Sequence, residues 1–237
     1  MKKSVFLAAI FMAGLMLLHI PGHAGAYETR GAIAMPIWSK LIDRLAADGY
    51  SRDEMIALFA RPEVVYLPKT IRSKMVPPFE RKFHPPASSG KSPTALLYAA
   101  MVTPQRISEA RKFLNANIAV FEQVEQVYHI PKSVLAAIIA VETRQGTFLG
   151  EQPAFSALAS LALATDMSVV LPFFSNRKLT KEQRAWIEKR AVEKGNWAYA
   201  ELKALLAYGQ ASGRDAVTMP GSIYGAIGLC QIGRAHV

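Results

Sequence analysis

The chain has 237 residues, of which 51% are hydrophobic and 19% are charged. This composition is too apolar for an intrinsically disordered chain and suffices for one large domain or two small ones. A single cysteine, Cys230, excludes an intrachain disulfide and any metal site built from several cysteines. The 28 Lys and Arg outnumber the 18 Asp and Glu, and the formal charge of +10 favours an anionic partner such as nucleic acid, phospholipid or an acidic polymer.

The N-terminus has the features of a secretory signal peptide. Two lysines precede the apolar run Val5–Leu18, and residues 24–26, Ala-Gly-Ala, have the small-x-small form that signal peptidase accepts. We therefore predict that residues 1–26 are removed, that the mature chain begins at Tyr27, and that the membrane is contacted only transiently. An uncleaved anchor is the alternative, although the run is shorter than the ~20 residues of a spanning helix. The mature chain keeps 26 Lys and Arg against 18 Asp and Glu, a charge of +8, and export argues against nucleic acid as its target.

Helical patterns dominate the rest of the chain. Apolar residues between Trp38 and Leu45 fall at helical spacing, and Gly49 ends that run. Ser51 and Glu54 form a capping box that begins a second helix. Between residues 61 and 93 the pattern breaks at seven prolines, so we expect an extended chain or a linker there.

Helical order returns at Thr103, which precedes a proline at the first helical position. One apolar stripe from Ile107 to Tyr128 predicts a single long helix that ends near His129. Pro131 then begins a helix through Val141 or slightly beyond.

The last part of the mature chain is helical as well. Thr180 and Gln183 form another capping box, Gly195 is expected to stop that helix, and Asn196 to cap a final one. No segment of four or more residues alternates convincingly at period two. The fold class is therefore all-α or nearly so.

Glu142 interrupts the apolar pattern of the helix that begins at Pro131. It follows Ile138 by four residues, so the sequence predicts a carboxylate on the apolar side of the helix. Desolvation there would disfavour the ionised form and keep the acid protonated, as general acid catalysis near neutral pH requires. Alternatively, a glutamate at a helix end accepts structural hydrogen bonds, and Arg144 is the candidate partner. The pattern alone leaves both interpretations open.

Three segments in succession resemble the membrane-bound lytic transglycosylase B family, whose members cleave peptidoglycan on a lysozyme-like helical fold. Residues 141–146, Val-Glu-Thr-Arg-Gln-Gly, resemble the catalytic-glutamate segment, and the Ala- and Leu-rich residues 155–161 stand where the family has a helix. Residues 220–231, PGSIYGAIGLCQ, resemble the substrate-cleft loop. The resemblance covers about residues 94–231 and implies an all-α, lysozyme-like catalytic domain.

The resemblance implies a role for each matching residue. Glu142 would be the sole catalytic acid and base and would first protonate the glycosidic oxygen between N-acetylmuramic acid and N-acetylglucosamine. It would then take the proton of the muramic acid's own 6-hydroxyl, which closes on the anomeric carbon and leaves a 1,6-anhydro end. Ser222 and Gln231 would bind the sugar. Gly221 would let the backbone approach it closely, and Tyr224 would stack on a sugar face or fill the core.

Other readings of these residues are structural. The loop at 220–231 could be a glycine-rich turn with small-residue packing, and Cys230 fits a buried small hydrophobe better than a nucleophile. The histidines of the mature chain, His84, His129 and His236, show no ligand spacing. We therefore predict no metal and no cofactor.

The match to the family ends abruptly. Residues 164–168 lack the basic and aromatic cleft residues that the family often has there, so that subsite is not carried over. Residues 232–237 bear no relation to the family's continuation and can be read as a sequencing-library adapter. We therefore expect a non-native tail at 232–237 and a catalytic domain, 94–231, that is C-terminally truncated and incomplete. Residues 27–93 would form N-terminal helices and a proline-rich connection.

Together these features predict an exported, periplasmic lytic transglycosylase that acts on peptidoglycan glycan strands. Other cell-wall enzymes are candidate partners, and the basic charge suits a polymer that carries stem-peptide carboxylates. A non-catalytic peptidoglycan-binding or assembly protein on the same scaffold is one alternative. A muramidase that uses water is another.

Overall fold

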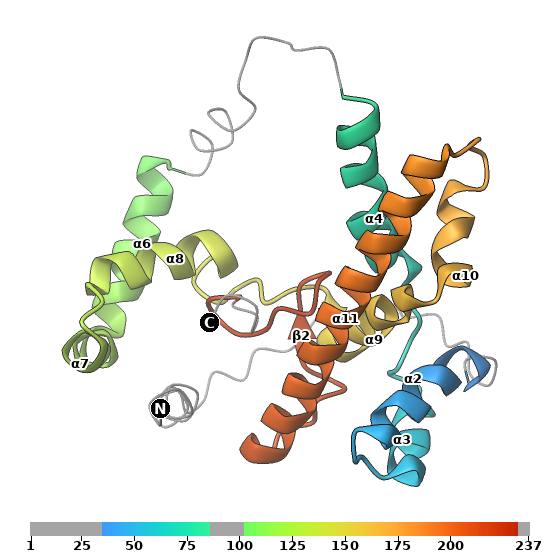
Figure 1. Ribbon diagram of the computed structural model, residues 1–237. Helices are drawn as coiled ribbons and strands as arrows, with labels where there is room; N and C mark the ends of the chain where they lie inside the picture. Colours follow the sequence, from blue (N-terminus) through green and yellow to red (C-terminus); the bar gives the residue numbers. More distant parts are fainter. Residues whose placement is uncertain (1–34, 86–101, 232–237) are drawn as a thin grey trace.

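The structure is a computed structural model that describes residues 35–85 and 102–231 (Figure 1). The expected signal peptide and the expected tail at 232–237 lie outside these residues. The described part is almost entirely helical, which confirms the all-α prediction. Its elements are α2 (Met35–Ala47), α3 (Arg52–Phe59), α4 (Pro68–Phe83), α6 (Pro104–Ala116), α7 (Ile118–Tyr128), α8 (Lys132–Thr143), β1 (Gln152–Pro153), α9 (Ala154–Ala162), η1 (Leu163–Thr165), α10 (Met167–Val170), η2 (Leu171–Phe174), α11 (Lys181–Ser212) and β2 (Pro220–Gly221).

The larger hydrophobic core surrounds α9. Every residue of this helix is buried, because α4 and the long α11 pack against it; Figure 1 shows α4 beside α11. The ring of Phe155 lies 5.1 Å from that of Phe59, which in turn lies 5.3 Å from that of Trp38. Hydrophobic packing therefore groups α2–α4 with α9–α11, although the expected domain boundary at residue 93 separates them along the chain.

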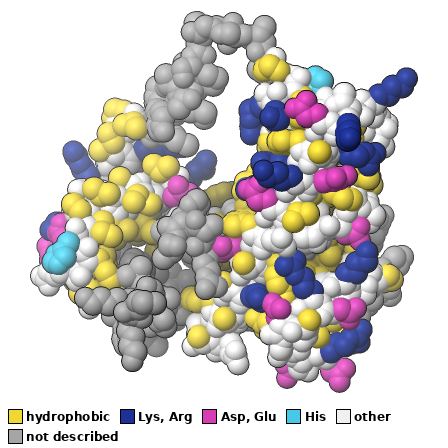
Figure 2. All heavy atoms as spheres, in the orientation of Figure 1, with side chains coloured by type: hydrophobic (Ala, Val, Ile, Leu, Met, Phe, Trp, Pro, Cys, Tyr) yellow, Lys and Arg dark blue, Asp and Glu magenta, His cyan; other side chains and the backbone are white. Residues whose placement is uncertain are grey.

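Helices α6, α7 and α8 form a smaller unit with its own core. Phe121, Leu135 and Ile139 lie at its centre, and Phe113 packs edge-on against Phe121 with ring centroids 5.9 Å apart. The opposite face of α8 is apolar and exposed, with Val134, Ile138 and Val141 each 41–50% accessible. Figure 2 shows hydrophobic side chains gathered over these three helices.

The prediction of extended chain or linker between residues 61 and 93 is wrong for 68–83, which form α4. Pro68 occupies the first turn of this helix, where its missing N–H costs nothing. Pro78 lacks the N–H that would bond the Lys74 carbonyl four residues earlier, and Arg190 Nε of α11 donates to that carbonyl instead, at 2.8 Å. Burial of one face of α4 against α9 and α11 outweighs the low helix propensity of its prolines.

The predicted single helix from Thr103 to His129 is in fact two helices. Asn117 leaves the helical conformation (φ −121°, ψ 24°), and its Nδ2 donates to the Phe113 carbonyl at 2.8 Å. This side chain competes with the backbone for the helical hydrogen bond, and the break lets α6 and α7 fold around α8. The predicted ends are confirmed, because Thr103 caps the Arg106 amide and His129 adopts a left-handed conformation.

Gly195 does not end a helix, and Asn196 does not cap one. The full capping box at Thr180 is confirmed, but α11 continues to Ser212. A Cβ at Gly195 would lie 2.7 Å from Thr165 Cγ2 and 2.8 Å from the Thr165 amide nitrogen. The glycine is therefore needed because α11 approaches η1 closely, and packing on α9 and η1 carries the helix through it.

Two buried serines of α9 hold the segment that leads into α4. Ser156 Oγ accepts from the Val65 amide at 3.1 Å and donates to the Glu63 carbonyl at 3.3 Å. One turn later, Ser160 Oγ accepts from the Leu67 amide at 2.8 Å. Both serine side chains are fully inaccessible to solvent.

Replacing Ser160 with alanine is therefore expected to lower the free energy of unfolding by about 1–3 kcal/mol, because the Leu67 amide would lose its partner away from water. Urea unfolding followed by circular dichroism measures this change. The matched control is Ser39→Ala, at an exposed serine whose hydroxyl donates to the Pro36 carbonyl of its own helix, where less than about 0.5 kcal/mol is expected. Equal losses in the two variants would contradict this role of Ser160.

Within the described ranges, no single helix combines the length and the apolar character needed to cross a membrane. Two bent pairs of helices, at 118–143 and 154–174, meet the criteria of length and composition only when each pair is taken together.

Candidate active site

The C-terminal end of α8 places Glu142 and Thr143 beside a tight left-handed turn. Arg144, Gln145 and Gly146 have φ values of 47°, 58° and 83°, a conformation that costs non-glycine residues about 1–2 kcal/mol each. Thr143 Oγ1 accepts from the Gly146 amide at 3.2 Å and lies 2.7 Å from the Leu229 carbonyl. The buried threonine thus links the end of α8, with its turn, to the loop at 220–231.

This loop begins with a short antiparallel pairing. In the register of β1 and β2, Gln152 lies opposite Gly221. Gly150 comes so close to β2 that a Cβ there would lie 1.9 Å from the Gly221 carbonyl oxygen. Only a glycine at this left-handed position (φ +109°) permits the approach.

Ser222 shapes the turn that follows. Its Oγ accepts from the Tyr224 and Ala226 amides, both at 3.2 Å. Its backbone also accepts from the Gly225 amide at 2.8 Å and donates to the Ala226 carbonyl at 2.9 Å. Because Oγ serves as an acceptor in both side-chain contacts, its own proton remains for a further acceptor.

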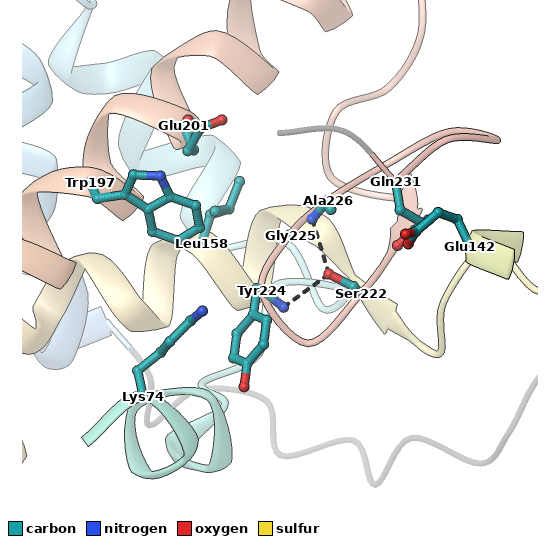
Figure 3. A pocket seen from close by; sticks show the side chains of 10 residues that line it. All are labelled: Lys74, Glu142, Leu158, Trp197, Glu201, Ser222, Tyr224, Gly225, Ala226 and Gln231. Atoms are coloured by element: carbon teal, nitrogen blue, oxygen red, sulfur yellow. Dashed lines mark hydrogen bonds between the residues drawn. The ribbon is translucent and has the colours of Figure 1, made fainter. Parts of the chain in front are cut away.

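A cavity of about 310 Å³ lies between the two cores. It is lined by Lys74, Glu142, Leu158, Trp197, Glu201, Ser222, Tyr224, Gly225, Ala226 and Gln231. Figure 3 shows Glu142 and Gln231 at one end, Ser222 and Tyr224 in the middle, and Lys74 and Trp197 at the other. The cavity is therefore an elongated cleft with the catalytic candidate at one end.

The structure brings four of the predicted site residues, Glu142, Ser222, Tyr224 and Gln231, to this cleft. Gly221 is buried beneath it instead, where a Cβ would lie 2.8 Å from the Ala226 carbonyl oxygen and 2.9 Å from Ala154 Cβ. Close packing against α9 therefore explains why this residue is a glycine.

Sequence reasoning missed Lys74, Trp197 and Glu201. Trp197 and Glu201 lie one turn apart on α11 and therefore share a face, which is a signal that the sequence carries. Lys74 carried no signal, because it lies in the segment that was predicted to be a linker. Only the packing of α4 on α11 brings it to the cleft.

Glu142 lies on an apolar row of its helix as predicted, but this row is exposed, so the prediction that its carboxylate is desolvated is wrong. The inward face of α8 consists of Leu135, Ala136, Ile139 and Thr143. Glu142 follows the row of Val134 and Ile138, which points outward. Among the described residues, neither Arg144 nor any other side chain forms an ion pair or hydrogen bond with the Glu142 carboxylate, so the alternative of a structurally paired glutamate finds no support.

The environments of Cys230 and Lys74 shift the pKa values of these two groups. Burial, together with the nearby charge of Glu142, raises the pKa of the Cys230 thiol, which keeps it protonated and poorly nucleophilic. Desolvation lowers the pKa of Lys74, and the positive charges of Lys194 and Arg190 lower it further. The Lys74 ammonium lies 3.4 Å from the centroid of the Tyr224 ring and 5.6 Å from that of Trp197. This face of Tyr224 is thus covered by a cation.

A comparison with models of protein families shows to which family the chain belongs. The model of the family described as the transglycosylase SLT domain matches residues 34–232, a range that includes every described helix and the whole cleft. The chain belongs to this family. The resemblance to lytic murein transglycosylases is thereby confirmed, whereas the narrower assignment to the membrane-bound B type stays a prediction.

Solved structures show that the SLT domain has the expected lysozyme-like, all-α fold. The Escherichia coli lytic transglycosylase Slt35 in complex with bulgecin A is 19% identical, with a TM-score of 0.60 over 86% of this chain and 55% of that one. SltB1 of Pseudomonas aeruginosa is 20% identical, with a TM-score of 0.56 over 84% and 54%. SltB3 of the same organism, in complex with NAG-anhNAM-pentapeptide, is 19% identical, with a TM-score of 0.56 over 82% and 42%.

The SLT-domain chain spans about half the length of these solved structures. No curated protein sequence matches it significantly. Within the described part of the chain, no three His, Cys, Asp or Glu side chains lie close enough together to hold a metal ion.

Proposed function

We propose that this protein is a peptidoglycan lytic transglycosylase in which Glu142 is the single catalytic acid and base. Glu142 donates its proton to the glycosidic oxygen between N-acetylmuramic acid and N-acetylglucosamine as the bond to the anomeric carbon breaks. The resulting carboxylate then takes the proton of the muramic acid's 6-hydroxyl, whose oxygen bonds to the anomeric carbon. Each turnover thus leaves a 1,6-anhydro end and returns Glu142 to its protonated form.

The observation that carries the proposal is the position of Glu142 in the cleft of an SLT domain. It is exposed at one end of a cavity of about 310 Å³ and has no polar partner among the described residues. A carboxyl group with a structural role would be expected to accept hydrogen bonds within the fold. A substrate can therefore reach this carboxyl group without displacing a protein contact.

In this proposal Ser222 and Gln231 orient the sugar. The Ser222 hydroxyl has its proton available, since its oxygen already accepts from two amides. Gln231 Nε2 donates to the carbonyls of Leu149 at 3.1 Å and Gly228 at 3.2 Å, which directs its Oε1 as an acceptor for a sugar hydroxyl. The cleft that Glu142 lines thus offers one donor and one acceptor to a bound sugar.

The free protein exposes Glu142, whereas a general acid must hold its proton until the bond breaks. We infer that the bound glycan strand supplies the missing desolvation. A sugar ring laid over the carboxyl group excludes water from it, which disfavours the ionised form.

A muramidase that uses water is the second candidate function. Most such glycosidases use two carboxyl groups, roughly 5–10 Å apart. The second acidic residue of the cleft is Glu201, which Figure 3 shows near Trp197 and away from Glu142. This arrangement favours the mechanism with one carboxyl group.

The proposal includes export. The lysines, the apolar run and the Ala-Gly-Ala site of residues 1–26 would direct the protein to the periplasm, where the glycan strands are.

The division of the mature chain into N-terminal residues 27–93 and a catalytic domain at 94–231 stays a proposal as well.

Product analysis tests the function directly. Purified protein is incubated with peptidoglycan sacculi, and the released muropeptides are separated and weighed by mass spectrometry. We expect anhydro-muramic ends, which are 18 Da lighter than hydrated ends because no water is added. Reducing ends would establish the muramidase instead, and binding to sacculi without release would establish the non-catalytic alternative.

A further inference from the structure

The end of the cleft opposite Glu142 holds a lysine in an unusual setting. Lys74 lies on α4 between two aromatic rings, with its ammonium nitrogen 3.4 Å from the Tyr224 centroid and 5.6 Å from the Trp197 centroid. Figure 3 shows its side chain reaching along the wall of the cleft toward Tyr224 and Trp197. The rings favour the charged form and limit the directions that the ammonium can take.

The backbone of Lys74 is fixed as well. Pro78 leaves the Lys74 carbonyl without its helical donor, and Arg190 of α11 fills that place at 2.8 Å. Lys74 is therefore attached to both helices that form this end of the cleft. A side chain held in this way loses little further freedom when it binds a ligand.

Two cations lie near Lys74, although one of them, Lys194, is ion-paired with Glu193 at 3.0 Å. Arg190 and Lys194, one turn apart on α11, both lower the pKa of Lys74, and within the described ranges no ion pair joins Lys74 to a carboxylate. Figure 2 shows Lys and Arg side chains interspersed with Asp and Glu over the α4 and α11 side of the molecule. An anion that bound to Lys74 would favour its charged form, which the neighbouring cations disfavour.

We propose that Lys74 binds a carboxylate of the peptide attached to N-acetylmuramic acid and so directs the enzyme to peptide-bearing strands. This inference rests on the proposed function and deepens it. Lys74 is here a specificity-determining residue that contacts the substrate away from the reacting atoms.

The chemistry of the polymer identifies the anion. The lactyl carboxyl group of muramic acid forms an amide with the stem peptide, so the sugars are neutral and the free carboxylates of the peptide are the anions of the strand. Lys74 and Glu142 line the same cleft at opposite ends. A group that extends from a sugar beside the cleaved bond can therefore reach the lysine while the bond lies at Glu142.

Three substrates separate the sources of the carboxylate. The first is a peptide-bearing, uncrosslinked glycan strand; the second is the same strand with its peptide carboxylates converted to amides; the third is a strand stripped of peptides, which exposes the lactyl carboxylate. For each, kcat/KM of the full-length protein is measured from the release of anhydro ends. Binding of the same strands is measured separately by isothermal titration calorimetry.

The wild-type protein is expected to prefer the peptide-bearing strand over the amidated one by roughly 10- to 100-fold, as for a hydrogen bond between charged partners. In Lys74→Met this ratio should fall to about one, whereas Lys74→Arg, which keeps the charge and confirms that the site folds, should retain most of it. Lys69→Met, at an exposed lysine on the same helix, is the matched control and should keep the wild-type ratio.

A wild-type ratio in Lys74→Met would overturn the inference. A larger loss on the stripped strand, the only one with a free lactyl carboxylate, than on the peptide-bearing strand would assign Lys74 to that carboxylate and would also overturn it. If the wild-type protein cleaves none of the strands, the proposed function fails. Calorimetry then still decides the role of Lys74, because it gives the ratio of the affinities for the peptide-bearing and the amidated strand. This ratio is compared between Lys74→Met and the wild type.

Discussion

Replacing Glu142 with glutamine is expected to lower the release of anhydro-muropeptides by on the order of 10²–10⁴-fold, the usual contribution of a general acid or base. An amide cannot donate a carboxyl proton to the glycosidic oxygen, and it cannot take the proton of the 6-hydroxyl. In a mechanism with one carboxyl group, both steps are lost together. The change is read from initial rates on purified sacculi.

The same variant separates catalysis from folding. Glu142 is exposed and has no polar partner among the described residues, so the free energy of unfolding should change by less than about 0.5 kcal/mol. Glu188→Gln, at an exposed glutamate on α11 outside the cleft, is the matched control and should leave the rate unchanged. Activity of Glu142→Gln within a few-fold of wild type would refute the catalytic assignment.

Replacing Phe155 with alanine is expected to cost about 3–5 kcal/mol of unfolding free energy, as for other fully buried phenylalanines. Phe155 is completely inaccessible, and its ring packs on Phe59 of α3. Its helix, α9, also carries Leu158, which contacts the loop of Ser222 where Gly225 leaves room for it. Such a loss is a large fraction of the about 5–15 kcal/mol that holds a typical domain folded.

Phe148→Ala provides the control, because this residue is 47% exposed and the same atoms are removed. Its loss should be about 1 kcal/mol or less. Denaturant unfolding of both variants measures the difference. If the two variants lose similar stability, α9 is not the centre of the larger core.

The chemistry of the site was predictable only in part. Resemblance to a family pointed to Glu142 and, 80 or more residues further along the chain, to Ser222 and Gln231, and the structure places all three in one cleft. The physical argument for Glu142 was wrong, since helical spacing says which residues share a face and not which face the rest of the chain covers. Ile138 shares that face and is exposed as well.

The sequence by itself determined where several helices begin. Thr103, Thr180 and Ser51 bond amides in the first turns of their own helices, and Gly49 follows α2 with a left-handed φ of +96°. These signals act over three or four residues, so they need no distant partner. The all-α class follows from them and from the helical spacing of apolar residues.

Tertiary structure alone decided where helices continue and what meets in the cleft. α4 forms despite Pro77 and Pro78, and α11 passes through Gly195, because burial against α9 and η1 outweighs the local cost of proline and glycine. The same packing brings Lys74 to Tyr224, 150 residues further along the chain. Contacts of this kind depend on how whole helices dock, and no pattern within a few residues encodes them.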